Sequence, residues 1–97
     1  MAQNSTITIA ADDWTQVTNG DATAVRVQNL GSEVMFKAAV GAVKPTDAQG
    51  ALFYSAGNGF DASVTLSNLF PGISGANRLY ARCSGTGVSG LVSVSHA

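Results

Sequence analysis

The sequence predicts an all-β fold, an eight-stranded sandwich of the jelly-roll or Greek-key type. About eight short runs of alternating apolar and polar residues follow one another at intervals of roughly 8–12 residues. The 11 glycines fall largely at the turns between these runs. No long stretch has the 3.6-residue periodicity of an amphipathic helix. We therefore expect a single β-sandwich domain over residues 1–97, with an up-and-down barrel as the alternative architecture.

Four of the expected strands lie in the first half of the chain. They cover residues 5–10, 14–18, 22–29 and 33–40, each bounded by turn-forming residues. In the fourth strand Val34, Phe36 and Ala38 share one face, while Met35 could also point inward. Residues 41–50 are rich in polar and chain-breaking side chains, which predicts an exposed loop.

The second half is expected to contain the other four strands. They cover residues 51–56, 60–66, 78–84 and 88–95. In the second of these runs, alternation predicts four inward side chains: Phe60, Ala62, Val64 and Leu66. In the third run, Leu79, Ala81 and Cys83 alternate with Arg78, Tyr80 and Arg82, so the second set is expected to point outward.

One short helical turn is predicted at residues 66–70. Leu66, Leu69 and Phe70 have the i, i+3, i+4 spacing of a single apolar helical turn. The following Pro71 ends the turn, because its ring removes an N–H and disfavours helical geometry at the residue before it. We expect this turn to act as an apolar plug that closes one end of the sandwich.

The composition favours a protein that lives in an assembly. Only 11% of the residues are charged, against about 25% in ordinary soluble proteins. A chain of 97 residues exposes much of its surface, and a surface with few charges is poorly protected against association. The alternative is a monomeric β domain whose surface is covered by serine and threonine.

Charge and hydropathy argue against several classes of partner. The net charge of −1 gives no electrostatic basis for binding nucleic acid or acidic lipid. No apolar stretch reaches the roughly 18 residues that a membrane span needs. The N-terminal residues lack the basic and apolar regions of a secretory signal peptide. With a single cysteine, no internal disulfide can form, so we expect folding in a reducing cytoplasm.

No catalytic, cofactor or metal site is predicted. Residues 85–90 match G-x-G-x-x-G, but no helix follows, so the motif indicates a turn and not a dinucleotide site. One histidine, His96, and one cysteine, Cys83, cannot form the usual zinc site, and the aspartates are scattered along the chain. We expect His96 to be frayed or locally packed, Cys83 to be a buried thiol, and the protein not to be an enzyme.

The interaction residues predicted from the sequence are arginines and aromatic residues. Arginine is enriched at interfaces because its planar guanidinium pairs with carboxylates and stacks on rings. The expected interface set is Trp14, Arg26, Phe70, Arg78, Tyr80 and Arg82. Alternatively, Trp14, Tyr54 and Tyr80 could form a platform that stacks on sugar rings, which would make the chain a carbohydrate-binding module.

Three stretches resemble small bacteriophage structural proteins. They are TITIAADDWTQVTNGDATAVRVQNLG, LSNLFPGISGANRLYARCSG and the closing VSVSHA, of which the middle stretch is the most specific. Such proteins look like head decoration (cement) proteins, and the resemblance carries no catalytic residues over to this chain. The resemblance implies a virion protein folded in the host cytoplasm. Its partners would be the major capsid protein and copies of itself, for example in a trimer. A tail, fibre or neck component is the alternative.

Overall fold

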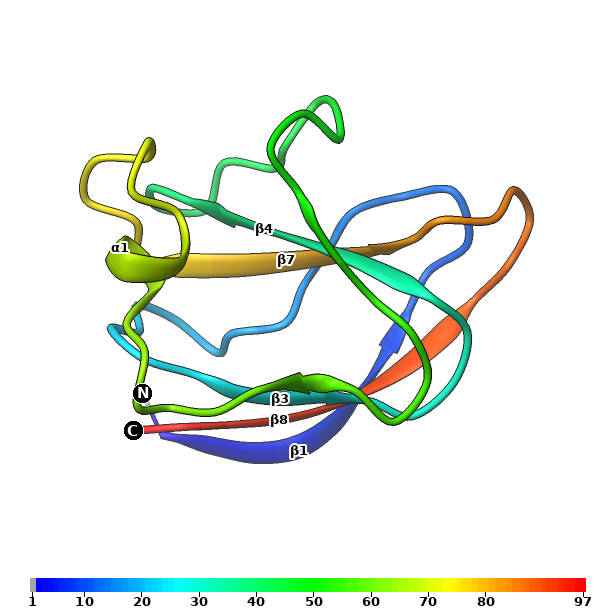
Figure 1. The fold of residues 1–97 in the computed structure, drawn as a ribbon, viewed down its shortest axis with the longest axis horizontal. Coiled ribbons are helices and arrows are strands. Elements are labelled where there is room, and N and C mark those ends of the chain that lie inside the picture. Colours follow the sequence, from blue (N-terminus) through cyan, green and yellow to red (C-terminus); the bar gives the residue numbers. More distant parts are fainter. Residues whose placement is uncertain (1) are drawn as a thin grey trace.

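Eight strands form two four-stranded antiparallel sheets in the computed structural model, which describes residues 2–97 (Figure 1). The first sheet has the order β1-β8-β3-β6, which are Gln3–Ile9, Gly90–His96, Arg26–Asn29 and Gly59–Phe60. The second sheet has the order β2-β7-β4-β5, which are Thr15–Gln16, Arg78–Cys83, Val34–Ala39 and Leu52–Tyr54. This interleaved order is that of a jelly roll, so the predicted fold class is confirmed.

The core fills the space between the two sheets. Alternation along β8 buries Val92 and Val94 completely, and alternation along β7 does the same for Leu79 and Ala81. Three rings connect the layers at the side where β5 faces β6. Phe36, Tyr54 and Phe60 make three edge-to-face pairs, each with ring centroids 5.7 Å apart.

The short helix α1, Leu66–Leu69, closes one end of the sandwich (Figure 1). Thr65 caps it, with its hydroxyl oxygen accepting a hydrogen bond from the Asn68 N–H at 3.1 Å. Leu66 is fully buried and Phe70 is 5% exposed, and both belong to the core cluster. The predicted apolar plug is therefore confirmed.

Asn29 is a fully buried polar residue at the opposite end of β3. Its amide nitrogen donates to the carbonyls of Ser32 at 2.8 Å and Tyr54 at 2.9 Å. Its side-chain oxygen accepts a bond from the Gly31 N–H at 3.0 Å. This one side chain ties the end of the first sheet to β5 and fixes the turn that leads into β4.

Several predicted strands are shorter in the structure. The expected strand over 60–66 is wrong after Phe60, because the chain turns there. The Ser63 N–H and hydroxyl both bind the Asp61 carboxylate, and Ala62, predicted to point inward, is exposed. The expected strand over 22–29 is regular only from Arg26, although the alternation that buries Val27 also buries Val25 before it. Residues 41–50 form the predicted loop.

Candidate interaction surfaces

The outer face of the first sheet is bare and nearly uncharged. Register places side chains of β1, β8 and β3 in rows on this face, with Asn4, Ser95 and Arg26 in one row and Thr6, Ser93 and Gln28 in the next. A third row continues the pattern with Thr8, Leu91 and Leu30, since the Leu30 N–H donates to the Leu91 carbonyl at 2.9 Å. We call these nine residues the bare face.

The two ends of the bare face differ chemically. At one end Leu30 and Leu91 are 48% and 44% exposed, which is unusual for large apolar side chains. Arg26, at the other end, is exposed and has no acidic side chain within ion-pair distance among residues 2–97. The surface beside Arg26 is hollowed, with a volume of about 500 Å³ lined also by Thr23, Ser95, His96 and Asp21, whose carboxylate pairs with Arg78. The bare face thus offers an apolar anchor, a central field of hydroxyl and amide groups, and one cation available to a carboxylate.

The outer face of the second sheet is covered over much of its area by the chain itself, although Phe53 of β5, on the same face as Met35, is 56% exposed. Trp14, Met35 and Tyr80 form a small apolar cluster there, each no more than 7% exposed, and Ala39 and Ala51 pack against it. Met35 therefore contributes to a second, outer cluster, while Val34 and Phe36 on the same strand fill the main core. The loop over residues 41–50 arches above this sheet (Figure 1).

Two ion pairs hold this loop. Lys37 of β4 contacts Asp47 at 3.0 Å, and Lys44 contacts Asp13 of the β1–β2 turn at 3.1 Å. The hydrogen bond from Lys44 lowers the pKa of Asp13, and the bond from Lys37 lowers the pKa of Asp47. On the second sheet, Lys37 therefore pairs with an acidic residue of the chain, whereas Arg82 does not.

The structure distributes the six predicted interface residues over different environments. Trp14, Phe70 and Tyr80 are at most 5% exposed, because they pack against other residues of the chain. Almost none of their surface is accessible to a partner. Arg78 pairs with Asp21 at 2.8 Å. Only Arg26 and Arg82 lack an acidic partner within ion-pair distance in the described chain, and they come from opposite sheets.

The three-ring sugar platform is not assembled. Tyr54 points into the core, where it packs on Phe36 and Phe60. Trp14 and Tyr80 lie in the outer cluster of the same sheet, and the Tyr80 hydroxyl donates to Gln16 at 3.1 Å. Because the rings occupy opposite faces of one sheet, they cannot stack on one ligand.

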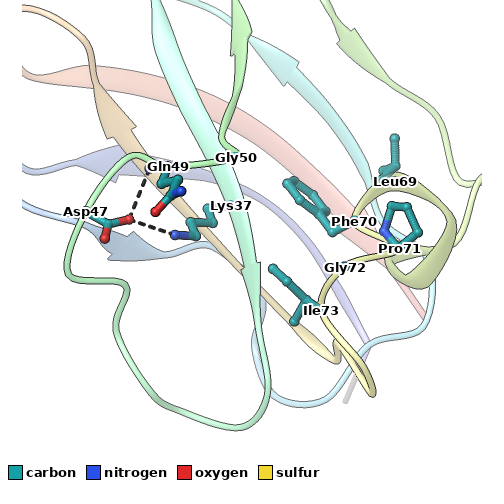
Figure 2. A pocket seen from close by; sticks show the side chains of 9 residues that line it. All are labelled: Lys37, Asp47, Gln49, Gly50, Leu69, Phe70, Pro71, Gly72 and Ile73. Carbon is teal, nitrogen blue, oxygen red and sulfur yellow. Dashed lines mark hydrogen bonds and ion pairs between the residues drawn. The ribbon is translucent and has the colours of Figure 1, made fainter.

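A groove of about 550 Å³ lies between the 41–50 loop and the segment that follows α1 (Figure 2). One wall carries Leu69, Pro71 and Ile73, and the other carries the Lys37–Asp47 ion pair. The apolar wall belongs to the LFPGI segment that the sequence analysis singled out. An apolar wall with a few polar groups opposite it is the general lining of a ligand site.

The reactive side chains are engaged in structural contacts. His96 is 7% exposed, its Nε2 accepts the Asn19 N–H at 3.1 Å, and its Nδ1 lies 2.9 Å from the Ala97 carbonyl oxygen. Of the two expectations for His96, local packing is confirmed. Cys83 is 2% exposed, and burial raises the pKa of its thiol, which disfavours the reactive thiolate.

The comparisons with protein families, with curated proteins and with solved structures find no match to this chain. Within residues 2–97 no group of three or more His, Cys, Asp or Glu side chains is arranged to hold a metal ion. In the same part of the chain, no helix has the length and apolar character to cross a bilayer.

Of the six interface residues predicted from the sequence, Arg26 is the one that lies on the bare face, and Phe70 belongs to the core. Sequence reasoning missed Leu30 and Leu91 as a pair, because their proximity depends on the pairing of β3 with β8. It also missed Asn29, since nothing local distinguishes a buried asparagine from one that ends a strand at the surface. The carbonyls of Ser32 and Tyr54 that bind its amide are brought to it only by the tertiary structure.

Proposed function

We propose that this protein is a non-enzymatic bacteriophage virion protein, specifically a capsid decoration protein that binds across neighbouring capsid subunits. The observation that carries the proposal is the bare face: three strands present one cation, two exposed leucines and otherwise uncharged polar side chains. The resemblance of the LSNLFPGISGANRLYARCSG segment to small phage structural proteins supports it. The fold is compatible with this role, because jelly rolls are frequent in viral capsids as well as in lectins.

The size of the bare face fits a role in a repeated lattice. With strands about 4.8 Å apart and a rise of about 3.4 Å per residue, the face covers on the order of 300 Å². A stable pairwise interface needs about 800 Å² on each partner. One copy would therefore bind weakly, and many copies on a symmetric shell would act together. Binding to the assembled shell, and not to its separated subunits, would stabilise the shell by mass action.

Cosedimentation of the purified protein with empty capsids of its phage, with tails in a parallel series, tests this function. We expect saturable binding to capsids and a higher capsid melting temperature. Binding to tails alone would support the alternative tail, fibre or neck component. Absence of binding to either particle at high protein concentration would refute the virion proposal, and glycans would then be the next ligands to test.

A pair of matched variants tests the face. Arg26→Glu should weaken capsid binding about tenfold or more, because it removes a cation from the contact and adds a like charge opposite the carboxylate that we expect there. Arg82→Glu makes the same change on the second sheet and should bind normally. The reverse result would place the interface on the second sheet and contradict the assignment of the bare face.

A further inference from the structure

The strand β1 is the only long sheet edge among the residues that the structure describes. Each sheet has two edge strands, and β6, β2 and β5 contain two, two and three residues, whereas β1 contains seven. Natural sheets protect such an edge with charged residues, proline or a bulge. The segment Gln3–Ile9, QNSTITI, contains no charge and no proline, and it pairs with β8 without interruption.

The register shows which backbone groups point outward from this edge. The Leu30 N–H bonds the Leu91 carbonyl, so the backbone groups of Leu91 point toward β3. In an antiparallel ladder this direction alternates from residue to residue, so Leu91 and Ser93 face β3 while Val92 and Val94 face β1. The backbone groups of their β1 partners, Ile7 and Ser5, therefore hydrogen-bond to β8. The backbone groups of the alternate residues of β1 point to the opposite side, away from the sheet.

The outward backbone groups thus belong to Asn4, Thr6 and Thr8. The alternation predicts that the Ala10 N–H also points away from β8. This N–H does not bond β8 and instead donates to the Thr15 hydroxyl at 3.1 Å. No backbone hydrogen bond to another described residue exists for Asn4, Thr6 or Thr8 on that side. Their side chains belong to the bare face.

We propose that two copies of this chain pair edge to edge through β1, antiparallel, about a two-fold axis at Thr6. In this register Thr6 faces Thr6 of the second copy, and Asn4 faces Thr8. These three facing pairs each exchange two backbone bonds, and every outward N–H and C=O of Asn4, Thr6 and Thr8 is then satisfied. A two-fold interface must be self-complementary, and an uncharged strand meets this condition without like-charge repulsion.

The pairing joins two first sheets into one continuous eight-stranded sheet. The two bare faces then become adjacent, which gives a surface on the order of 600 Å² with an Arg26 at each end. The dimer stands independently of the virion role, because it rests only on the edge. Should the capsid proposal hold, the dimer would bring the contact area close to that of a standard interface.

Sedimentation velocity of the purified full chain, without capsids, tests the dimer. We expect a concentration-dependent species of twice the 9.8 kDa chain mass. Thr6→Pro removes an N–H that the fold itself does not use, so it should give a folded monomer by circular dichroism. The control, Thr6→Val, keeps the N–H and should remain dimeric. A monomeric or trimeric wild-type protein, or a folded Thr6→Pro variant that still dimerises, would overturn the proposal.

Cross-linking tests the register and does not depend on the proline variant. The two copies of residue 6 should have Cα atoms about 5.5 Å apart, whereas the two copies of residue 8 should be about 14 Å apart. A short bis-maleimide should therefore link Thr6→Cys efficiently and Thr8→Cys poorly; Cys83 is buried and does not compete. Equal yields from both variants, or a higher yield from Thr8→Cys, would overturn the two-fold axis at Thr6. Because no capsid is present, this result is separate from the outcome of the capsid experiment.

Discussion

Removal of the Asn29 side chain should destabilise the fold more than any other single polar truncation. In Asn29→Ala, the carbonyls of Ser32 and Tyr54 and the N–H of Gly31 lose their side-chain partners. Asn29 is fully buried, while Gly31 and Tyr54 are half-buried and Ser32 is exposed. A buried polar group left without a partner costs about 1–3 kcal/mol. We expect a loss of about 3–5 kcal/mol in the free energy of unfolding, a large share of the roughly 5–15 kcal/mol typical of a domain.

Urea denaturation followed by the fluorescence of the single tryptophan, Trp14, measures this loss. The matched control is Gln28→Ala, one residue earlier in β3. It removes a single exposed bond, from the Gln28 amide to the Gly57 carbonyl, and should change stability by less than about 1 kcal/mol. A loss below about 1 kcal/mol for Asn29→Ala would refute the reasoning, because it would mean that the two carbonyls find other partners without cost.

The Asn29→Asp variant tests the same two donor bonds with almost no change of side-chain volume. A carboxylate can still accept the Gly31 N–H, but it has no donor for the two carbonyls, and its charge would be buried. At neutral pH this variant should be at least as unstable as Asn29→Ala. Burial without a cation raises the pKa of such a carboxyl, so its deficit should shrink as the pH falls and the proton restores one donor. A variant that is stable at pH 7 would contradict the assignment of both donors.

Three further outcomes follow from the structure. Gly59→Ala should be strongly destabilising in thermal melts, because a β-carbon there would clash with the Val27 carbonyl oxygen and lie 2.8 Å from the Gln28 Cα. The control, Gly72→Ala, places its β-carbon where no atom lies within 4 Å and should melt near the wild-type temperature. In an NMR titration the pKa of the Asp47 carboxyl should lie below its ordinary value of 3.8, and Lys37→Ala should raise it again. The small stabilisation from this ion pair is therefore present above pH 3.8 and lost as the pH falls through the lowered pKa. Cys83 should resist a thiol reagent in the native protein and react on unfolding, since it is buried and its thiol pKa is raised; rapid native labelling would contradict this placement.

Much of the fold could be predicted because alternation and turn chemistry are local. The period of two in β7 separated Leu79, Ala81 and Cys83 from the outward Arg78, Tyr80 and Arg82, and the first three are at most 2% exposed. The spacing of Leu66 and Phe70, with Pro71 behind them, identified the plug. The pattern failed over residues 60–66, where apolar and polar residues alternate but Asp61 bonds Ser63 and turns the chain. A side chain that competes for backbone hydrogen bonds decided the local structure there, against the alternation.

The candidate surfaces were less predictable, because burial on an outer face depends on what lies above it. Tyr80 and Arg26 have the same outward phase along their strands. Tyr80 is nonetheless buried, because it packs with Trp14 and Met35 on the outside of the second sheet, and Arg26 is exposed because nothing covers the first. Pairwise register also decided which strand edge remained open. β1 is an edge because β8 pairs with it on one side only.

The sequence by itself determined the fold class, the positions of most strands, the closing helical turn and the scarcity of charge. All of these depend on residue type and on spacing within about ten residues. The tertiary structure decided which sheet each strand joined, which outer face stayed bare, and where Asn29 and the outward groups of β1 found or lacked partners. Those features depend on contacts between residues far apart in the chain, such as Asn29 with Tyr54 and Leu30 with Leu91, and no local pattern encodes them.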